Sequence, residues 1–364
     1  MKEVGTIAFA EKVLTLLELG LTSATYKYAL LTAIIDLCLE QTSASGSPPT
    51  SLTTRQLAEK VVQLYWGHAI PYEGGPVLRQ GGVNDQQQAE IVRAISNFRG
   101  AHAGAKGELH FQAAIEHPRE FERLVRAVEW KLIEMPIPRL QVMGQEEVRF
   151  LYEYGWDQRI KQSGVSSYQR GEPGHFDNRL TLQPEVAERL IALSGVLRPV
   201  LRREWSLLVA SMNDLPEARL DEHLFGSPRT SLEPVRTDLR ELQDGRCFYC
   251  RERLGDKAEV DHFIPWARYA DNALDNLVAA HPVCNNQKRD FFAAAQHLSE
   301  WLARSARHDS ELTEIAARAS WVRAPERSRA VARVMYTRLP AGTRVWVRAT
   351  ELVPHIPSEI SAYF

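Results

Sequence analysis

The first forty residues repeat apolar and polar side chains with the period of a helix. Tyr26, Leu30 and Ile34 recur four positions apart, so we predict helix here and place Cys38 on the buried side as a small apolar residue. A flexible, turn-rich connection is predicted for residues 42–50, which contain Ser, Gly and a Pro-Pro pair.

Capping signals and prolines then mark helix ends further along the chain. Thr53 and Gln56 have the spacing of a capping box and predict that another helix starts there. Pro136 predicts that a preceding helix ends near Glu134, because proline supplies no backbone donor.

Two segments of the chain have the residue pattern of strands. Val148–Trp156 is rich in aromatic and β-forming residues, which are typical of strands. The alternation in Thr343–Arg348 predicts an edge strand or, with the neighbouring arginines, a surface that follows a nucleic-acid backbone.

These patterns predict an α+β protein with four segments. Residues 1–110 form a helical domain that suits a winged-helix-like unit binding DNA or a protein partner, and equally a plain helical bundle. Residues 111–205 form a mixed α/β linker domain with the small β-containing segment. Residues 206–310 form the domain that holds most of the cysteines, and residues 311–364 form a basic helix and strand extension packing on it.

Composition narrows the class of protein. The 364 residues are 25% charged and 44% hydrophobic, which is ordinary for a globular chain, and the net charge of −2 gives no global attraction to nucleic acid. A DNA-binding surface must therefore come from local clusters of Lys and Arg. The start of the chain has no apolar signal core, and no apolar run has membrane-spanning length. We therefore expect a cytoplasmic protein without membrane contact.

Three of the four cysteines fall in one short stretch with metal-ligand spacing. Cys247 and Cys250 form a C-x-x-C knuckle, and His281 and Cys284 repeat the same spacing further along. A lone C-x-x-C is also typical of a redox pair or of chance, but two matched half-sites favour a metal. Thiolates and an imidazole suit Zn²⁺ rather than Mg²⁺ or Ca²⁺. We predict a structural zinc cage.

A second set of polar residues lies between and beyond the knuckles. Asp261 directly precedes His262 inside an apolar, strand-like run, and neighbours on a strand point to opposite faces. At least one of the two side chains is therefore buried or used by a metal or substrate. Asn276 follows, and after Cys284 the chain continues Asn285-Asn286-Gln287-Lys288 into a predicted helix.

This combination resembles the HNH endonuclease family, the ββα-metal nucleases, over roughly residues 240 to 295. The family pattern is a D-H dipeptide, an N-L dipeptide and a C-[HN]-x-x-K helix start between two zinc knuckles. Here its three signature positions are His262, Asn276 and Asn285, an H-N-N variant. The sequence departs from the pattern in having Asn at the third position and His281 in place of a zinc-binding cysteine.

The resemblance implies a role for each matched residue. His262 would be the general base that takes a proton from water. Asp261 and Asn285 would bind one catalytic Mg²⁺ or Mn²⁺, with Asn286 as a substitute ligand, and that ion would polarise the phosphate. Asn276 would orient the loop that carries the His262 ring. Lys288 and Arg289 would contact the nucleic-acid phosphates.

The expected activity is metal-dependent hydrolysis of DNA phosphodiester bonds, in a setting such as bacterial defence against foreign or phage DNA. Cleavage of both strands by a single-metal centre would favour a homodimer, and the first 230 residues would suit a regulatory protein partner. The alternative, from a different functional class, is a non-catalytic zinc-knuckle protein that binds nucleic acid or has a regulatory role.

Overall fold

The fold was described from a computed structural model. It describes residues 2–19, 24–81, 88–102, 109–157, 159–172, 176–216, 220–226, 232–255 and 257–364. These residues form two compact units, and each is described by itself. Unit 1 consists of Met1–Cys38 and Pro48–Gly226, and unit 2 consists of Leu39–Ser47 and Ser227–Phe364. The division of the chain into the four segments predicted from the sequence stays a prediction.

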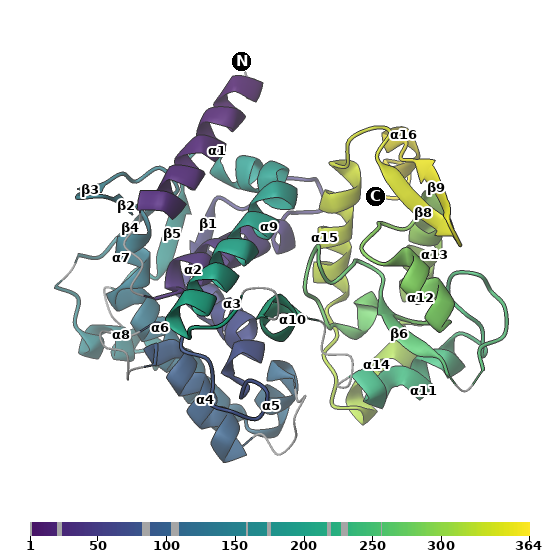
Figure 1. The fold of residues 1–364 in the computed structure, drawn as a ribbon, viewed down its shortest axis with the longest axis horizontal. Helices are drawn as coiled ribbons and strands as arrows, with labels where there is room; N and C mark the ends of the chain where they lie inside the picture. The colour runs from purple at the N-terminus through teal and green to yellow at the C-terminus, as the bar shows by residue number, and fades with distance from the viewer. Residues whose placement is uncertain are drawn as a thin grey trace. The chain divides into compact units, whose positions relative to one another are not determined.

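Unit 1 is mainly helical, with a small sheet. Its α-helices are α1 (Lys2–Leu19), α2 (Tyr26–Glu40, up to Cys38), α3 (Thr54–Tyr65), α4 (Glu90–His102), α5 (His110–Glu116), α6 (Pro118–Glu134), α7 (Pro136–Leu140), α8 (Gln162–Gln169), α9 (Val186–Met212) and α10 (Leu220–Phe225). The long helix α9 runs beside α1 and α2 (Figure 1), and Tyr28 of α2 stacks on Trp205 of α9. Cys38 is fully buried, as predicted.

The predicted helix boundaries in unit 1 are confirmed. Thr53 is the N-cap of α3, and its side chain and that of Gln56 form the reciprocal capping box. Helix α6 ends at Glu134, and α7 begins at Pro136 with a new N-terminus. Local chemistry decides both boundaries, because a cap supplies backbone partners and a proline removes one.

The sheet of unit 1 is smaller than the sequence predicts. Its order is β1 (Ser51–Thr53), β5 (Arg179–Leu182) and β4 (Tyr152–Tyr154), all antiparallel, and a separate hairpin joins β2 (Val142–Met143) to β3 (Glu146–Glu147). Strand β4 covers only three residues of the predicted run Val148–Trp156. The Oε1 atom of Gln141 accepts the amides of Leu151 and Tyr152 at 2.7 and 3.2 Å, so a side chain takes backbone donors that a longer strand would use.

Unit 2 is an α+β unit built around a two-stranded hairpin. Its elements are α11 (Glu233–Leu242), β6 (Glu259–His262), β7 (Leu277–Ala280), α12 (Pro282–Lys288), α13 (Ala295–Arg307), α14 (Asp309–Arg318), α15 (Pro325–Thr337), β8 (Arg344–Arg348), β9 (Glu351–Pro354) and α16 (Pro357–Ile360). Strands β8 and β9 form a hairpin of their own close to α12 and α13 (Figure 1). This confirms the predicted strand at Thr343–Arg348.

The segment Leu39–Ser47 belongs to unit 2 although it follows a helix of unit 1. An Nη2 donor of Arg333 bonds the carbonyls of Thr42 and Ser43 at 3.1 and 2.7 Å. Tyr269 donates its hydroxyl to Glu40 at 2.5 Å. The predicted flexible connection is therefore held in place, because its backbone carbonyls find a guanidinium partner that lies far away in sequence.

The fold class predicted from the sequence is confirmed. Helices dominate the first unit, small antiparallel sheets accompany them, and a ββα arrangement with a Cys/His cluster follows in the second. Within the described ranges, none of the helices combines the length and the apolar character needed to cross a bilayer.

Candidate functional site

Four side chains of unit 2 form a compact cluster of metal-ligand atoms. The ligand atoms of Cys247, Cys250, His281 and Cys284 all lie within 4.8 Å of one another. The Cys250 Sγ atom is 3.3 Å from Nδ1 of His281, and Nε2 of that ring is 3.0 Å from the Arg253 carbonyl. The carbonyl accepts the Nε2 proton, so Nδ1 is the basic nitrogen turned toward the thiols. The two sequence half-sites therefore meet as one donor set that fits Zn²⁺.

The electrostatics of the cluster also suit a cation. Burial raises the pKa of Cys250 and of Cys284, and the neighbouring Cys247 raises both further. The raised pKa values disfavour the thiolate forms when only the protein surrounds these two thiols. A divalent cation would favour the thiolate forms and release the thiol protons on binding.

The hairpin β6–β7 lies against this cluster and leads into α12. Its strands pair antiparallel, with His262 opposite Leu277 and Glu259 opposite Ala280. The Phe248 amide of the first knuckle donates to the Ala279 carbonyl at 3.0 Å, which ties the knuckle to β7. Helix α12 starts one residue after His281, with proline at its first position. The cluster therefore fixes both the hairpin and the start of the helix.

One face of β6 presents carboxylates to α12. Alternation places Glu259 and Asp261 on the same face, and both make contacts to the helix. The Asp261 Oδ2 atom is 3.0 Å from Nζ of Lys288, and Asn285 donates its Nδ2 to the Glu259 Oε2 atom at 2.8 Å. Asp261 and Asn285 therefore each bond a side chain across the interface of strand and helix, Asp261 with Lys288 and Asn285 with Glu259. Carboxylate and amide oxygens are the ligands that Mg²⁺ and Mn²⁺ prefer.

His262, the last residue of β6, is a neutral buried imidazole. Only 5% of it is exposed, and its Nε2 is 2.8 Å from Oδ1 of Asn272. An amide oxygen only accepts, so Nε2 carries the proton and Nδ1 is the basic nitrogen. Burial lowers the pKa of His262 below its usual value, and the bond to Asn272 opposes that shift in part. The ring is therefore unprotonated near neutral pH, as a general base requires.

Asn276 braces the loop between His262 and β7. Its Oδ1 accepts the Ile264 amide at 2.8 Å, and its Nδ2 donates to the carbonyls of Ile264 and Asp271 at 3.3 and 3.0 Å. The Phe263 amide donates to the Asn276 carbonyl at 2.8 Å. These contacts join both ends of the loop directly beside His262.

Buried acidic side chains hold the same loop from the other side. Asp275 pairs with Arg323 at 2.7 Å and accepts the Ala324 amide at 2.7 Å. Burial alone would raise the pKa of Asp271, but the charge of Arg327 at 2.8 Å and two hydrogen bonds bring it below its usual value. Both carboxylates are paired with a guanidinium, and both are 1% exposed.

The structure corrects the sequence on Lys288. The predicted phosphate contact is replaced by complete burial, since the side chain is 0% exposed and its Nζ also donates to the His262 carbonyl at 2.8 Å. Lys288 is the last residue of the short helix α12, and its side chain lies over the hairpin, where Asp261 compensates its charge. Arg289 and Asn286 are exposed. Their predicted roles stay predictions.

Three residues of the site were missed by sequence reasoning. Glu259 has a signal in the sequence, because it lies two positions before Asp261 and so shares its face on a strand. Tyr249, which donates its hydroxyl to the Asp261 Oδ2 atom at 2.5 Å, lies inside the C-x-x-C knuckle, where only the cysteines attract notice. Asn272 has no signal in the sequence, because its contact to His262 depends on the path of the loop.

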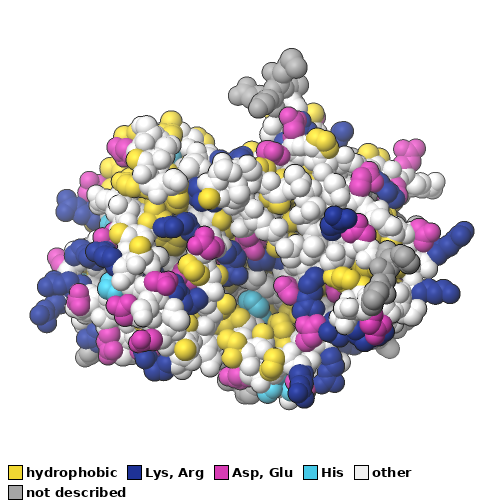
Figure 2. Space-filling model, turned by 180° about the vertical axis from the view of Figure 1, so that it is seen from behind, with side chains coloured by type: hydrophobic (Ala, Val, Ile, Leu, Met, Phe, Trp, Pro, Cys, Tyr) yellow, Lys and Arg dark blue, Asp and Glu magenta, His cyan; other side chains and the backbone are white. Residues whose placement is uncertain are grey.

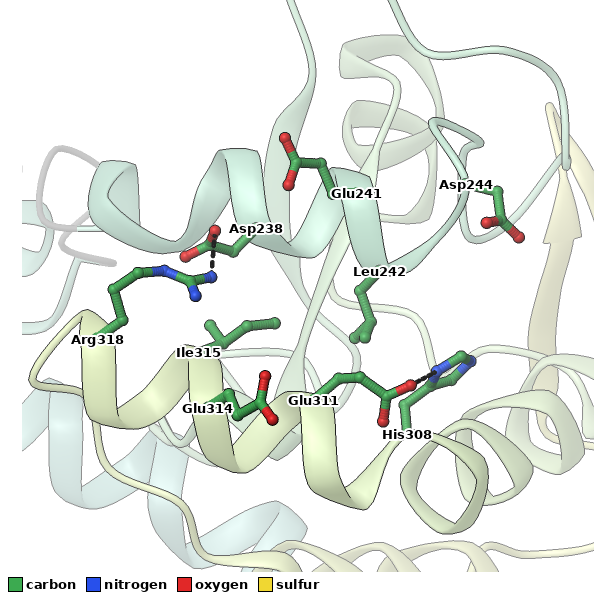
Figure 3. A pocket seen from close by; sticks show the side chains of 9 residues that line it. All are labelled: Asp238, Glu241, Leu242, Asp244, His308, Glu311, Glu314, Ile315 and Arg318. Carbon is green, nitrogen blue, oxygen red and sulfur yellow. Dashed lines mark hydrogen bonds and ion pairs between the residues drawn. The ribbon is translucent and has the colours of Figure 1, made fainter.

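A groove elsewhere in unit 2 does not share residues with this site. It has a volume of about 320 Å³ and lies between α11 and α14, with carboxylates from both helices along it (Figure 3). Arg318 pairs with Asp238 at 2.7 Å and His308 with Glu311 at 3.3 Å, which leaves most of its charge negative. Such a lining repels phosphate. On the face drawn in Figure 2, basic and acidic side chains are interspersed, in line with the small net charge.

The comparisons with known proteins agree with this division of the chain. No curated protein and no solved structure matches it. Residues 247–294 match the family model described as HNH endonuclease, which confirms the resemblance and supports nuclease activity in general. Residues 5–224, more than half of the chain, match the model described as domain of unknown function (DUF8808). The protein therefore belongs to the DUF8808 family and carries, after that domain, an HNH endonuclease module with a zinc-type Cys/His cluster.

Proposed function

We propose that this protein is an endonuclease that hydrolyses DNA phosphodiester bonds with a single divalent metal ion. One observation carries the proposal: the bond from His262 Nε2 to Asn272 leaves a neutral Nδ1 as the basic atom of the strand that also bears Asp261. A base and hard metal ligands at adjacent positions are what a metal-assisted hydrolase needs. The match to HNH endonucleases supports the same reading.

The residues act in the following way in this proposal. Nδ1 of His262 takes a proton from water, and the resulting hydroxide attacks phosphorus. The bond to the 3′ oxygen breaks and this oxygen takes up a proton from solvent, which leaves a 5′-phosphate and a 3′-hydroxyl. Asp261 and Asn285 would hold Mg²⁺ or Mn²⁺, which would supply Lewis-acid stabilisation of the leaving oxygen. Asn276 and Asn272 fix the loop and the imidazole, and exposed Arg289 is the proposed phosphate contact.

The wider setting is part of the proposal. A cytoplasmic role in bacterial defence against foreign DNA fits a nuclease module joined to a large second domain, by association with other proteins of this organisation. The small net charge supports a protein partner that helps to bring DNA to the site. A homodimer would allow two single-metal centres to cut both strands.

The test is cleavage of supercoiled plasmid by the full chain with Mg²⁺, with Mn²⁺ and with EDTA. We expect wild type to nick or linearise the plasmid with either metal, and His262→Ala to lose at least about a hundredfold in rate, because general-base catalysis contributes roughly 10²–10⁴-fold. His355→Ala is the matched control, since His355 is equally buried in unit 2 (4% exposed) and has no role in the proposed reaction. Cleavage by His262→Ala at the wild-type rate would contradict the role of His262 as the base, whereas absence of metal-dependent cleavage by wild type would favour a non-catalytic nucleic-acid-binding protein.

A further inference from the structure

Tyr249 links the two metal-binding regions of unit 2. It lies between Cys247 and Cys250 in the knuckle turn, and its hydroxyl reaches the Asp261 Oδ2 atom at 2.5 Å. The turn itself is fixed by backbone bonds from the Cys247 amide to the Glu252 carbonyl and from the Arg251 amide to the Cys247 carbonyl. Any ion that holds the two thiolates also fixes the backbone that carries this hydroxyl.

The ring of Tyr249 has little freedom to move. Only 6% of the residue is exposed. Its ring meets Phe248, His297 and Trp346 edge to face, with centroid distances of 5.2, 5.4 and 5.1 Å. A ring wedged on three sides delivers its hydroxyl to one place, so the direction of the bond to Asp261 is set by packing rather than by the carboxylate.

The two donors on Asp261 meet the same oxygen. Tyr249 and Lys288 both bond Oδ2, at 2.5 and 3.0 Å. Among the residues that the structure describes, no side chain donates to Oδ1 of Asp261. The carboxylate is therefore held by one oxygen in a fixed orientation, with the other available as a ligand. Carboxylate ligands of metals are commonly oriented by hydrogen bonds of this kind, and loss of such a partner weakens the metal site.

We propose that Tyr249 is a positioning residue through which the zinc knuckle holds the catalytic carboxylate of Asp261 ready for the divalent ion. This inference rests on the proposed function. It gives the zinc cluster a second task beyond bracing the fold, because occupancy of the knuckle determines where the hydroxyl of Tyr249 lies. Loss of zinc would then weaken binding of the catalytic metal before it unfolds the unit.

A second buried tyrosine of unit 2, Tyr336, serves as a control that distinguishes a positioning role from the ordinary burial of a tyrosine side chain. Tyr336 is 1% exposed in the same unit, and its hydroxyl donates to the Ala293 carbonyl at 3.0 Å. Tyr249→Phe and Tyr336→Phe each remove one buried hydroxyl and keep the ring. The two changes should therefore cost similar stability, whereas only the first removes a hydrogen bond from a proposed metal ligand.

The experiment measures Mn²⁺ binding to the full chain by electron paramagnetic resonance, together with zinc content and plasmid cleavage. We expect Tyr249→Phe to retain its zinc but to bind Mn²⁺ about 10–100-fold more weakly, as is typical for loss of a partner of a metal ligand. Tyr336→Phe should bind Mn²⁺ as wild type does. In an Asp261→Ala background, removal of the Tyr249 hydroxyl should make no further difference to Mn²⁺ binding.

Equal Mn²⁺ affinity in Tyr249→Phe and wild type would overturn the positioning role, and so would equal weakening in the two phenylalanine variants. Wild type and His262→Ala are assayed alongside. If these two cleave alike while Tyr249→Phe still binds Mn²⁺ weakly, the proposed reaction is wrong but the positioning of Asp261 stands. Absence of Mn²⁺ binding by wild type would overturn both.

Discussion

The polar network around Gln80 in unit 1 joins neutral groups, whereas the network around the loop from Phe263 to Asn276 in unit 2 is charged. In unit 1, Gln80 accepts from Thr25 and Trp205 at 2.9 and 2.8 Å and donates to Nδ1 of His68 at 2.9 Å. Tyr65 completes the network through the Thr25 hydroxyl at 2.7 Å. Every bond joins uncharged groups, so the network orders a helical core without the cost of burying an ion.

Unit 2 buries ions around the loop from Phe263 to Asn276. Asp271 pairs with Arg327 and Asp275 with Arg323, and the guanidinium of Arg304 donates to the carbonyls of Leu277 and Asp275 at 2.6 and 3.0 Å. Burying such groups costs several kcal/mol per ion, and partners of good geometry offset this cost. In unit 2 these buried ion pairs hold an irregular loop to one path beside His262, whereas the neutral network of unit 1 joins segments that helices already position.

The largest effect is expected for Cys247→Ser, which breaks unit 2 alone. Loss of one thiolate should abolish zinc binding and destabilise unit 2 by on the order of 5 kcal/mol or more, because the free energy of zinc binding adds to that of folding. Unit 1 has its own core and should keep its unfolding transition. Zinc content and chemical denaturation measure both effects.

Cys38→Ala is the matched control for this change, since Cys38 is buried in unit 1. It should leave zinc content unchanged. A Cys247→Ser protein that retains one zinc and a normal unit 2 transition would show that the cluster is not a zinc site.

A smaller loss is expected for Asp275→Ala, which tests the charged loop. The change removes the buried carboxylate that pairs with Arg323, which keeps only the exposed Asp309 at 2.9 Å, so we expect a cost toward the lower end of the about 3–5 kcal/mol for breaking a buried pair. Urea denaturation of unit 2 measures it. The exposed pair of Asp238 and Arg318 is the control, and Asp238→Ala should cost less than about 1 kcal/mol. Equal effects of the two changes would remove the distinction drawn between the loop and the surface.

The smallest effect is expected for the pH dependence of the stability of unit 1, whose neutral network includes His68. Burial lowers the pKa of His68 to about 3, against about 6.5 in the unfolded chain. The unfolded state therefore takes up the proton first. The stability that His68 permits is complete above pH 6.5 and declines as the pH falls toward 3, by about 1.4 kcal/mol per unit at most.

Urea denaturation of unit 1 at pH 7.5 and pH 5.5 measures this decline, with His68→Gln for comparison. Wild type should lose about 1 kcal/mol more than the variant between these pH values. The same loss in both proteins would show that His68 does not titrate on unfolding of unit 1.

Several local features were predictable from the sequence because adjacent residues decide them. The capping box at Thr53 and the helix end before Pro136 depend on backbone partners within a few positions. The four cluster residues were predictable because ligand spacing reflects the geometry of a metal knuckle. The role of His262 as a base was implied by the resemblance to HNH endonucleases, and the structure adds the tautomer and the burial of this ring.

Other features depend on contacts between distant parts of the chain. Strand β4 pairs with β5, some thirty residues later, and begins where Gln141 accepts the backbone amides of Leu151 and Tyr152. The segment Leu39–Ser47 joins unit 2 through Arg333, almost three hundred residues away.

The sequence by itself determined which chemical groups the protein brings to its site: the thiols and imidazole of a Cys/His cluster, and the side chains proposed as the base and hard ligands of a nuclease. Only the tertiary structure decided how they are held. It buried Lys288 against Asp261 and His262 instead of exposing it to phosphate, and it aimed the Tyr249 hydroxyl at Asp261. The physical reason is that residue identity fixes ligand and proton chemistry, whereas burial and hydrogen-bond partners follow from packing between segments that the sequence does not order in space.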